Sequence, residues 1–116
     1  LKPGAPRLEV GTTSPAPYHG LTAAIGTVEA LGYDTVTGRI ERLTDRLKEG
    51  LGDRLLSPHN YESGLVAFTA DDPAGLVERL ADEGVHVRSL PYPDAVRASV
   101  HVFNTAGDVD ALLDAL

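Results

Sequence analysis

The sequence predicts a small α/β domain in which helices cover a short mixed β-sheet in two layers. Three observations lead to this prediction. Residues 64–69 form a nearly continuous apolar run of strand length. Residues 84–104 contain two segments of alternating β-branched residues on either side of a proline-rich bend. In the remaining chain, apolar residues recur at the spacing of helices that bury one face.

The start of the chain is rich in helix-breaking residues. Residues 1–18 contain four prolines and two glycines, so we expect an extended lead-in from a missing large domain, with the small domain covering residues 19–116. Residues 7–10 are expected to form a short strand before Gly11-Thr12-Thr13-Ser14. A glycine followed by three hydroxyl groups can bind phosphate, but as an isolated pattern it is more typical of a polar loop or a helix cap.

Two helices are predicted in the first half of the chain. The first covers residues 19–32 and ends at Gly32, and the second covers residues 34–51 with Asp34 as its N-cap. The charged residues of the second helix are predicted to form a solvated face without a functional role. They are Arg39, Glu41, Arg42, Asp45, Arg46, Lys48 and Glu49.

The second half begins with an irregular segment that contains a short edge strand at residues 54–56 and a polar loop at residues 59–63. The apolar run at residues 64–69 is the predicted central strand, and a right-handed crossover should join it to a parallel partner. The crossover helix starts at the N-cap Asp72 and ends at Gly84. A last helix is capped by Asn104 or Thr105 and closes the chain.

The bend in residues 84–104 is predicted to be a hairpin with strands at residues 85–88 and 96–103. Folding about the middle of the loop between them places Arg88 opposite Arg97. Directly opposed like charges destabilise a strand pair, so this pattern indicates an anion, a carboxylate or a phosphate, held by both guanidinium groups. The alternative is a pair of surface arginines that form ion pairs with some of the many acids.

Composition excludes several classes of partner. The net charge is −7, from 17 acids and 10 bases, which argues against nucleic acid. No apolar run reaches the roughly 18 residues of a membrane span, and no secretory leader is recognisable. Cysteine is absent, so neither disulfides nor thiolate metal sites are expected within this chain. These features favour an intracellular, cytoplasmic address, and the acid-rich, lysine-poor composition suits a salt-loving source.

The sequence contains few candidate catalytic residues. The four histidines show no metal-ligand spacing, and His101 is predicted to be a half-buried strand residue rather than a base. No serine lies in a nucleophile elbow, and no glycine-rich phosphate loop is present. The chain starts at Leu1 and lacks methionine, so we expect it to be the trailing part of a longer protein. By itself it should bind anions and catalyse nothing.

Three short patterns occur in one order along the chain: Arg7-Leu8-Glu9-Val10-Gly11-Thr12, then Gly84-Val85-His86-Val87-Arg88, then Arg97-Ala98-Ser99 followed by Phe103-Asn104-Thr105. Together they resemble the C-terminal part of class V aminotransferases, the pyridoxal-phosphate family that includes cysteine desulfurases and isopenicillin-N-epimerase-like proteins. The resemblance covers almost the whole chain. It implies the small domain of a fold-type I enzyme.

The resemblance implies a role for several residues of this chain. Arg97 would hold the α-carboxylate of an amino-acid substrate, and Arg88 would lie near the same pocket. Gly11 and Thr12 would reach the phosphate of the pyridoxal 5'-phosphate bound to the other subunit of a homodimer. The lysine that carries the cofactor would lie in the preceding large domain.

The sequence also departs from the family. Neither Lys2 nor Lys48 has the context of the cofactor-binding lysine. Cysteine desulfurases carry a nucleophilic cysteine between the two arginines, whereas residues 89–96 contain none. The resemblance therefore favours an aminotransferase, lyase or epimerase-like enzyme over a persulfide-forming one. Two further hypotheses stay open: a free-standing regulatory module that binds a small carboxylate through Arg88 and Arg97, and a structural interaction domain.

Overall fold

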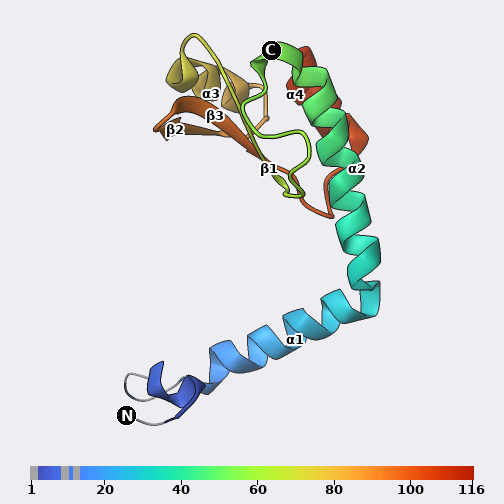
Figure 1. Ribbon diagram of the computed structural model, residues 1–116, viewed down its shortest axis with the longest axis vertical. Helices are drawn as coiled ribbons and strands as arrows, with labels where there is room; N and C mark the ends of the chain where they lie inside the picture. The colour runs from blue at the N-terminus through green and yellow to red at the C-terminus, as the bar shows by residue number, and fades with distance from the viewer. Residues whose placement is uncertain (1–2, 9–10, 12–13) are drawn as a thin grey trace. The chain divides into compact units, whose positions relative to one another are not determined.

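The computed structural model describes residues 3–8, 11 and 14–116. Its backbone contacts divide the chain into two compact units, and the division falls between Tyr33 and Asp34. The first unit contains the 3-10 helix η1 (Ala5–Leu8) and the helix α1 (Pro15–Leu31), which begin the ribbon in Figure 1. The predicted lead-in therefore lies in one unit with α1.

The prediction that residues 1–18 contain no helix is wrong for their described part. η1 occupies the start of the strand predicted at residues 7–10, while residues 9 and 10 lie outside the described residues. α1 begins at Pro15, because proline is tolerated in the first helical turn, where its missing N–H would have no partner. Gly32 ends α1 as predicted, with a φ of +84° that favours glycine.

The apolar residues of α1 predicted the helix correctly, but none of its described side chains is buried. Leu21 and Ile25 keep 57% and 43% of their surface exposed. The hydrophobic core lies in the second unit instead, where α2 (Tyr33–Leu51), α3 (Pro73–Asp82) and α4 (Ala106–Asp114) pack with the strands. The core residues are Leu43, Leu47, Leu51, Val66, Phe68, Leu80, Val96, Ala98, Val100, Val109 and Leu112.

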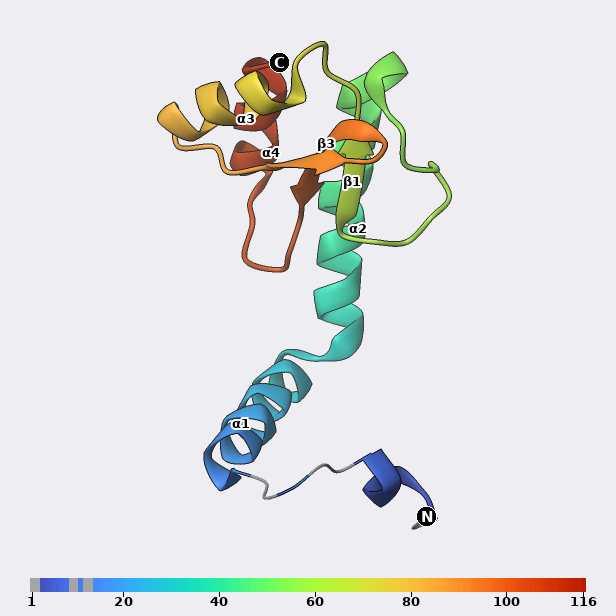
Figure 2. The ribbon, with the colours of Figure 1, turned by 90° about the vertical axis from the view of Figure 1, so that its left-hand side faces the viewer.

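The sheet of the second unit consists of β1 (Leu65–Phe68), β2 (Arg88–Pro91) and β3 (Asp94–Ser99). With the helices that cover it, as seen in Figures 1 and 2, it confirms the predicted α/β fold. Along β3, Val96 and Ala98 are buried in the core. Because successive strand residues point to opposite faces, Arg97 lies on the other face of the sheet.

The prediction of a mixed sheet is wrong for the described strands. The strand order is β1-β3-β2, and both pairings are antiparallel. β1 and β2 consequently run in the same direction, as the crossover through α3 predicted, but they are not neighbours. The hairpin after β2 folds β3 into the space between them. β3 thereby gains a hydrogen-bonding partner on each edge, which a strand at the margin of the sheet would lack.

The ends of the hairpin strands differ from the prediction. Residues 85–87 lie outside β2, and β3 ends at Ser99. Beyond it the chain turns, because Asn104 accepts a hydrogen bond from the N–H of His101 through its side chain (2.8 Å) and donates its own N–H to the His101 carbonyl (3.0 Å). His101 is therefore an exposed turn residue rather than a half-buried strand residue. The predicted edge strand at residues 54–56 is reduced to one bridge, between Leu55 and Phe68.

The two later helices begin at predicted caps. The Asp72 side chain accepts a hydrogen bond from the N–H of Gly75 at the start of α3 (3.0 Å). Of the two candidates for α4, Thr105 is the cap, and it forms a reciprocal capping box with Asp108. The hydrogen bond that the Thr105 N–H donates lowers the pKa of the Asp108 carboxyl, so this carboxylate stays charged near the positive end of the helix dipole.

Gly64 is a point where the packing leaves no space for a side chain. Its carbonyl accepts the N–H of Val100 (2.7 Å), and a Cβ at this position would meet the Val100 carbonyl oxygen. We expect Gly64→Ala to lower the free energy of unfolding by about 1–3 kcal/mol, because the backbone after β3 must move. Urea denaturation measures the change. The control is Gly26→Ala in α1, where a Cβ meets nothing within 4 Å; an equal loss in both variants would contradict the prediction.

Arg46 and Asp110 join α2 to α4 through a bidentate ion pair with distances of 2.7 and 2.9 Å. The hydrogen bond and charge of Arg46 lower the pKa of Asp110 from its usual 3.8. Because the pKa is lower in the folded state, the pair stabilises the fold above about pH 4 and loses this contribution as the pH falls through the folded-state value.

We therefore expect Asp110→Asn to unfold at a lower urea concentration than the parent protein at about pH 7, with the difference shrinking towards about pH 2 and in about 1 M salt. The effect should be small, since both side chains are about half exposed. The exposed Asp53 serves as control, and Asp53→Asn should unfold at the urea concentration of the parent protein at about pH 7. A difference for Asp110→Asn that is the same at both pH values would rule out the ion pair as its cause.

Candidate functional site

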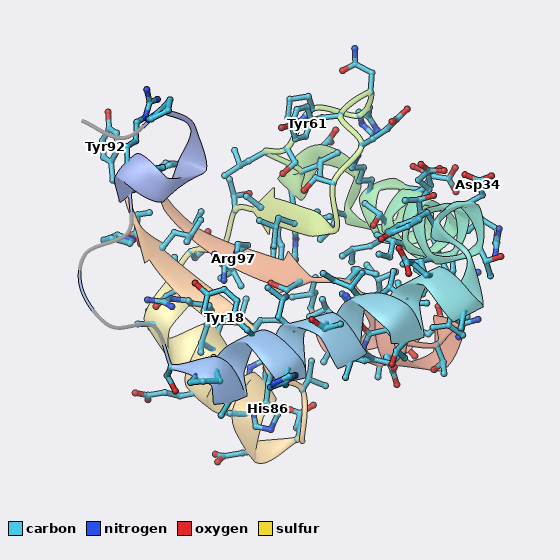
Figure 3. All side chains as sticks on the ribbon, turned by 90° about the horizontal axis from the view of Figure 1, so that it is seen from below. Tyr18, Asp34, Tyr61, His86, Tyr92 and Arg97 are labelled. Atoms are coloured by element: carbon cyan, nitrogen blue, oxygen red, sulfur yellow. The ribbon has the colours of Figure 1, made fainter. Side chains whose placement is uncertain are left out.

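The hairpin arginines lie opposite each other, as predicted. In the register of β2 and β3, Arg88 pairs with Arg97 and Leu90 pairs with Ala95. A turn of only two residues, Tyr92-Pro93, connects the strands, so the hairpin is shorter at its tip than the sequence suggested. Figure 3 labels Arg97 on the hairpin ribbon and Tyr92 at its end.

The two guanidinium groups differ in exposure. Arg88 is exposed, whereas Arg97 is half-buried, and its Nε is a buried donor with no hydrogen-bond partner. Within the described part of the chain, neither arginine forms an ion pair, since the ion pairs found there involve Arg46 and Arg79. A buried N–H without an acceptor is destabilising. The hairpin thus presents two positive charges and a free donor, an arrangement suited to an anion with two oxygens.

The opening loop is only partly described. Gly11 is exposed and has a φ of +100°, which requires glycine, and a Cβ there would meet nothing within 4 Å. Thr12 lies outside the described residues. The phosphate-binding role of Gly11 and Thr12 stays a prediction.

Two cations of α2 contradict the prediction that the charged residues of this helix form a solvated face. Lys48 is only 3% exposed, and its Nζ donates to the carbonyls of His59 (3.2 Å) and Tyr61 (2.8 Å). Arg39 is half-buried and donates to the carbonyls of Val102 (2.6 Å) and Asn104 (2.7 Å). Each cation thus holds a different loop against α2 by hydrogen bonds to its carbonyls.

The sequence did contain an indication that Lys48 is buried. Lys48 lies four residues after Thr44 and three before Leu51, a helical spacing that continues the apolar stripe on one side. Thr44 and Leu51 are both buried. No local pattern, however, indicates which loop would fold over that side of the helix.

Other kinds of site receive no support within the described residues. No group of three or more His, Cys, Asp or Glu side chains there is arranged to hold a metal ion. The search of the same residues for a helix long and apolar enough to cross a membrane found none.

Comparisons with known proteins agree with the resemblance seen in the sequence. No family model matches the chain. A probable cysteine desulfurase of Streptomyces coelicolor is 30% identical over 133 residues, covering 98% of this chain and 32% of that protein. A probable cysteine desulfurase of Pyrococcus abyssi is 30% identical over 128 residues, covering 95% and 32%. The chain therefore spans about a third of the length of the curated relatives it matches.

Solved structures show the same relationship. The complex of the cystine C-S lyase C-DES with its reaction product cysteine persulfide matches 93% of this chain with a TM-score of 0.80 and 28% identity. A lysine-to-alanine variant of C-DES with glycine covalently linked to its PLP cofactor matches equally well. The match covers 30% of each C-DES chain. From these likenesses in sequence and fold, the chain is homologous to about a third of proteins described as probable cysteine desulfurases and of the cystine C-S lyase C-DES.

Proposed function

We propose that this chain is the C-terminal small domain of a pyridoxal-phosphate enzyme and that it binds the α-carboxylate of an amino-acid substrate through Arg97 and Arg88. The observation that carries the proposal is the buried, unpartnered Nε of Arg97, directly opposite a second arginine in the sheet register. A carboxylate would supply the missing acceptor and relieve the repulsion between the two guanidinium groups.

The scaffold suits this role because Arg97 lies on β3, which pairs with a strand on each side. A guanidinium held there binds a carboxylate in one orientation, since its planar fork matches the two oxygens. Fixing the carboxylate determines which bond of the substrate Cα faces the reaction centre. Pyridoxal phosphate, when bound, supplies the electron sink for charge that develops at that carbon.

Gly11 and Thr12 are proposed to contact the cofactor phosphate of the other subunit in a homodimer. The left-handed backbone of Gly11 and the open space around it fit a close approach of its N–H to a phosphate oxygen.

The acidic composition and the absence of cysteine from the chain support a cytoplasmic enzyme, in a compartment that keeps thiols reduced.

Among reaction classes, lyase or aminotransferase chemistry fits this chain better than sulfur transfer to a protein thiol. The hairpin turn has only two residues between its strands, and the chain has no cysteine to accept sulfur. The similarity to C-DES, a cystine C-S lyase, supports the lyase alternative.

We expect Arg97→Ala in the cofactor-loaded protein that carries this chain to weaken transition-state binding by about 2–5 kcal/mol, mostly through a higher KM. The reason is that an anchored carboxylate would lose its charged partner. Steady-state kinetics with the amino acid, and with the matching amine that lacks the carboxylate, measure the effect. Only the amino acid should become a poorer substrate.

Arg42→Ala, which removes an exposed arginine of α2, is the control and should leave both substrates unaffected. Normal amino-acid binding by Arg97→Ala would refute the assignment. If instead the protein binds carboxylates through Arg97 but shows no cofactor absorbance, it is the free-standing regulatory module.

A further inference from the structure

A second hollow, which shares no residue with the hairpin, lies between α2 and the loop that leads into β1. Its volume is about 620 Å³. Its wall from α2 includes Glu41, Thr44, Asp45 and Lys48, and the opposite wall is formed by residues 59–64. Figure 3 labels Tyr61 on this loop beside the first strand. All of these residues belong to the second compact unit.

The α2 wall of the hollow carries a buried positive charge, that of Lys48. The Lys48 ammonium has three N–H donors, and the two acceptors found for it are the carbonyls of His59 and Tyr61. No carboxylate oxygen of the described residues lies within the 4.0 Å of an ion pair with it. A charge removed from water is destabilising unless a partner compensates it. Its two carbonyl acceptors leave the charge of Lys48 without a neutralising partner among the described residues.

Thr44 supplies a second unused polar group beside Lys48. It lies one helical turn earlier on the same side of α2, is 2% exposed, and its Oγ1 is buried without a hydrogen-bond partner. A threonine within a helix commonly satisfies its hydroxyl by donating to a carbonyl of the preceding turn, which Thr44 does not do. One wall of the hollow thus holds a hydroxyl without a partner next to an ammonium whose charge is not neutralised.

The rim of the hollow has the opposite charge. Glu41, Asp45 and Glu62 line it and are exposed. A phosphate dianion in the hollow would be repelled by these three carboxylates. A molecule with one carboxylate and one cationic group would place the carboxylate at the donors and the cation among the rim acids.

We propose that this hollow is a second binding site, for a zwitterionic amino acid whose carboxylate is held by Lys48 and Thr44 and whose ammonium lies near the rim carboxylates. It does not depend on the hairpin arginines. The hollow is large enough for such a ligand, and bound ligand would bring α2 and the loop at residues 59–64 together.

Glycine betaine is the probe for this site. It is zwitterionic, but its nitrogen carries no proton, so it cannot condense with the aldehyde of a pyridoxal cofactor. Binding is measured by isothermal titration calorimetry on the cofactor-loaded protein that carries this chain, in an Arg97→Ala background that disables the hairpin. We expect saturable binding at one site, with acetate at least tenfold weaker and phosphate not bound.

Thr44→Val is the decisive variant because it keeps the shape of the side chain and removes the hydroxyl. We expect betaine affinity to fall about tenfold, the range for a lost hydrogen bond to a charged group, while the melting temperature stays equal or rises because a buried unpaired hydroxyl is gone. Thr35→Val, at an exposed position of α2 outside the hollow, is the matched control and should bind normally.

Lys48→Met should abolish saturable binding. If that variant fails to fold, Thr44→Val alone decides the question. The proposal is overturned if the betaine affinity of Thr44→Val is unchanged, or if no saturable binding occurs in the Arg97→Ala background. Lys48 would then only hold the loop at residues 59–64 against α2. Either result leaves the role of Arg97 intact, since that role is tested with the substrate.

Discussion

The pairing of β3 with a strand on each of its edges is the constraint on which the rest of this structure depends. It fixes the register in which Val96 and Ala98 face the helices and Arg97 faces away from them. A shift of one residue would turn Arg97 into the core and the apolar residues out of it. The strong preference for burying the apolar residues therefore also determines where the guanidinium group lies, opposite Arg88.

A second organising feature is the use of cations of α2 to hold loops. Arg39 binds carbonyls at Val102 and Asn104, and Lys48 binds carbonyls at His59 and Tyr61. Carbonyl acceptors satisfy hydrogen bonds but do not neutralise a charge, so a buried ammonium held in this way still favours an anion nearby. The hollow beside Thr44 is lined by this ammonium and by the loop that it contacts. Arg46, in contrast, is matched by Asp110 and only joins two helices.

Two surfaces of the chain are left uncovered within the described residues. This is consistent with its homology to part of a larger enzyme. The arginine face of the hairpin has no ion-pair partner within the described residues, and α1 buries none of its described side chains. The chain matches about a third of each relative. Such surfaces fit the proposal that the remaining part of the protein completes the amino-acid site, with the hairpin supplying its carboxylate-binding wall.

The sequence by itself determined the features that depend on neighbouring residues. Apolar spacing identified the helices, Asp72 and Gly32 marked helix ends, and the short bend at Tyr92 set the register that opposes Arg88 and Arg97. Only the tertiary structure decided the features that depend on residues distant in sequence. It placed β3 between β1 and β2, ended β3 at Ser99 before the turn that starts at His101, and buried Lys48 under a loop. The physical reason is that a local pattern records which side of an element is apolar, whereas the partner that covers that side is chosen by packing of the whole domain.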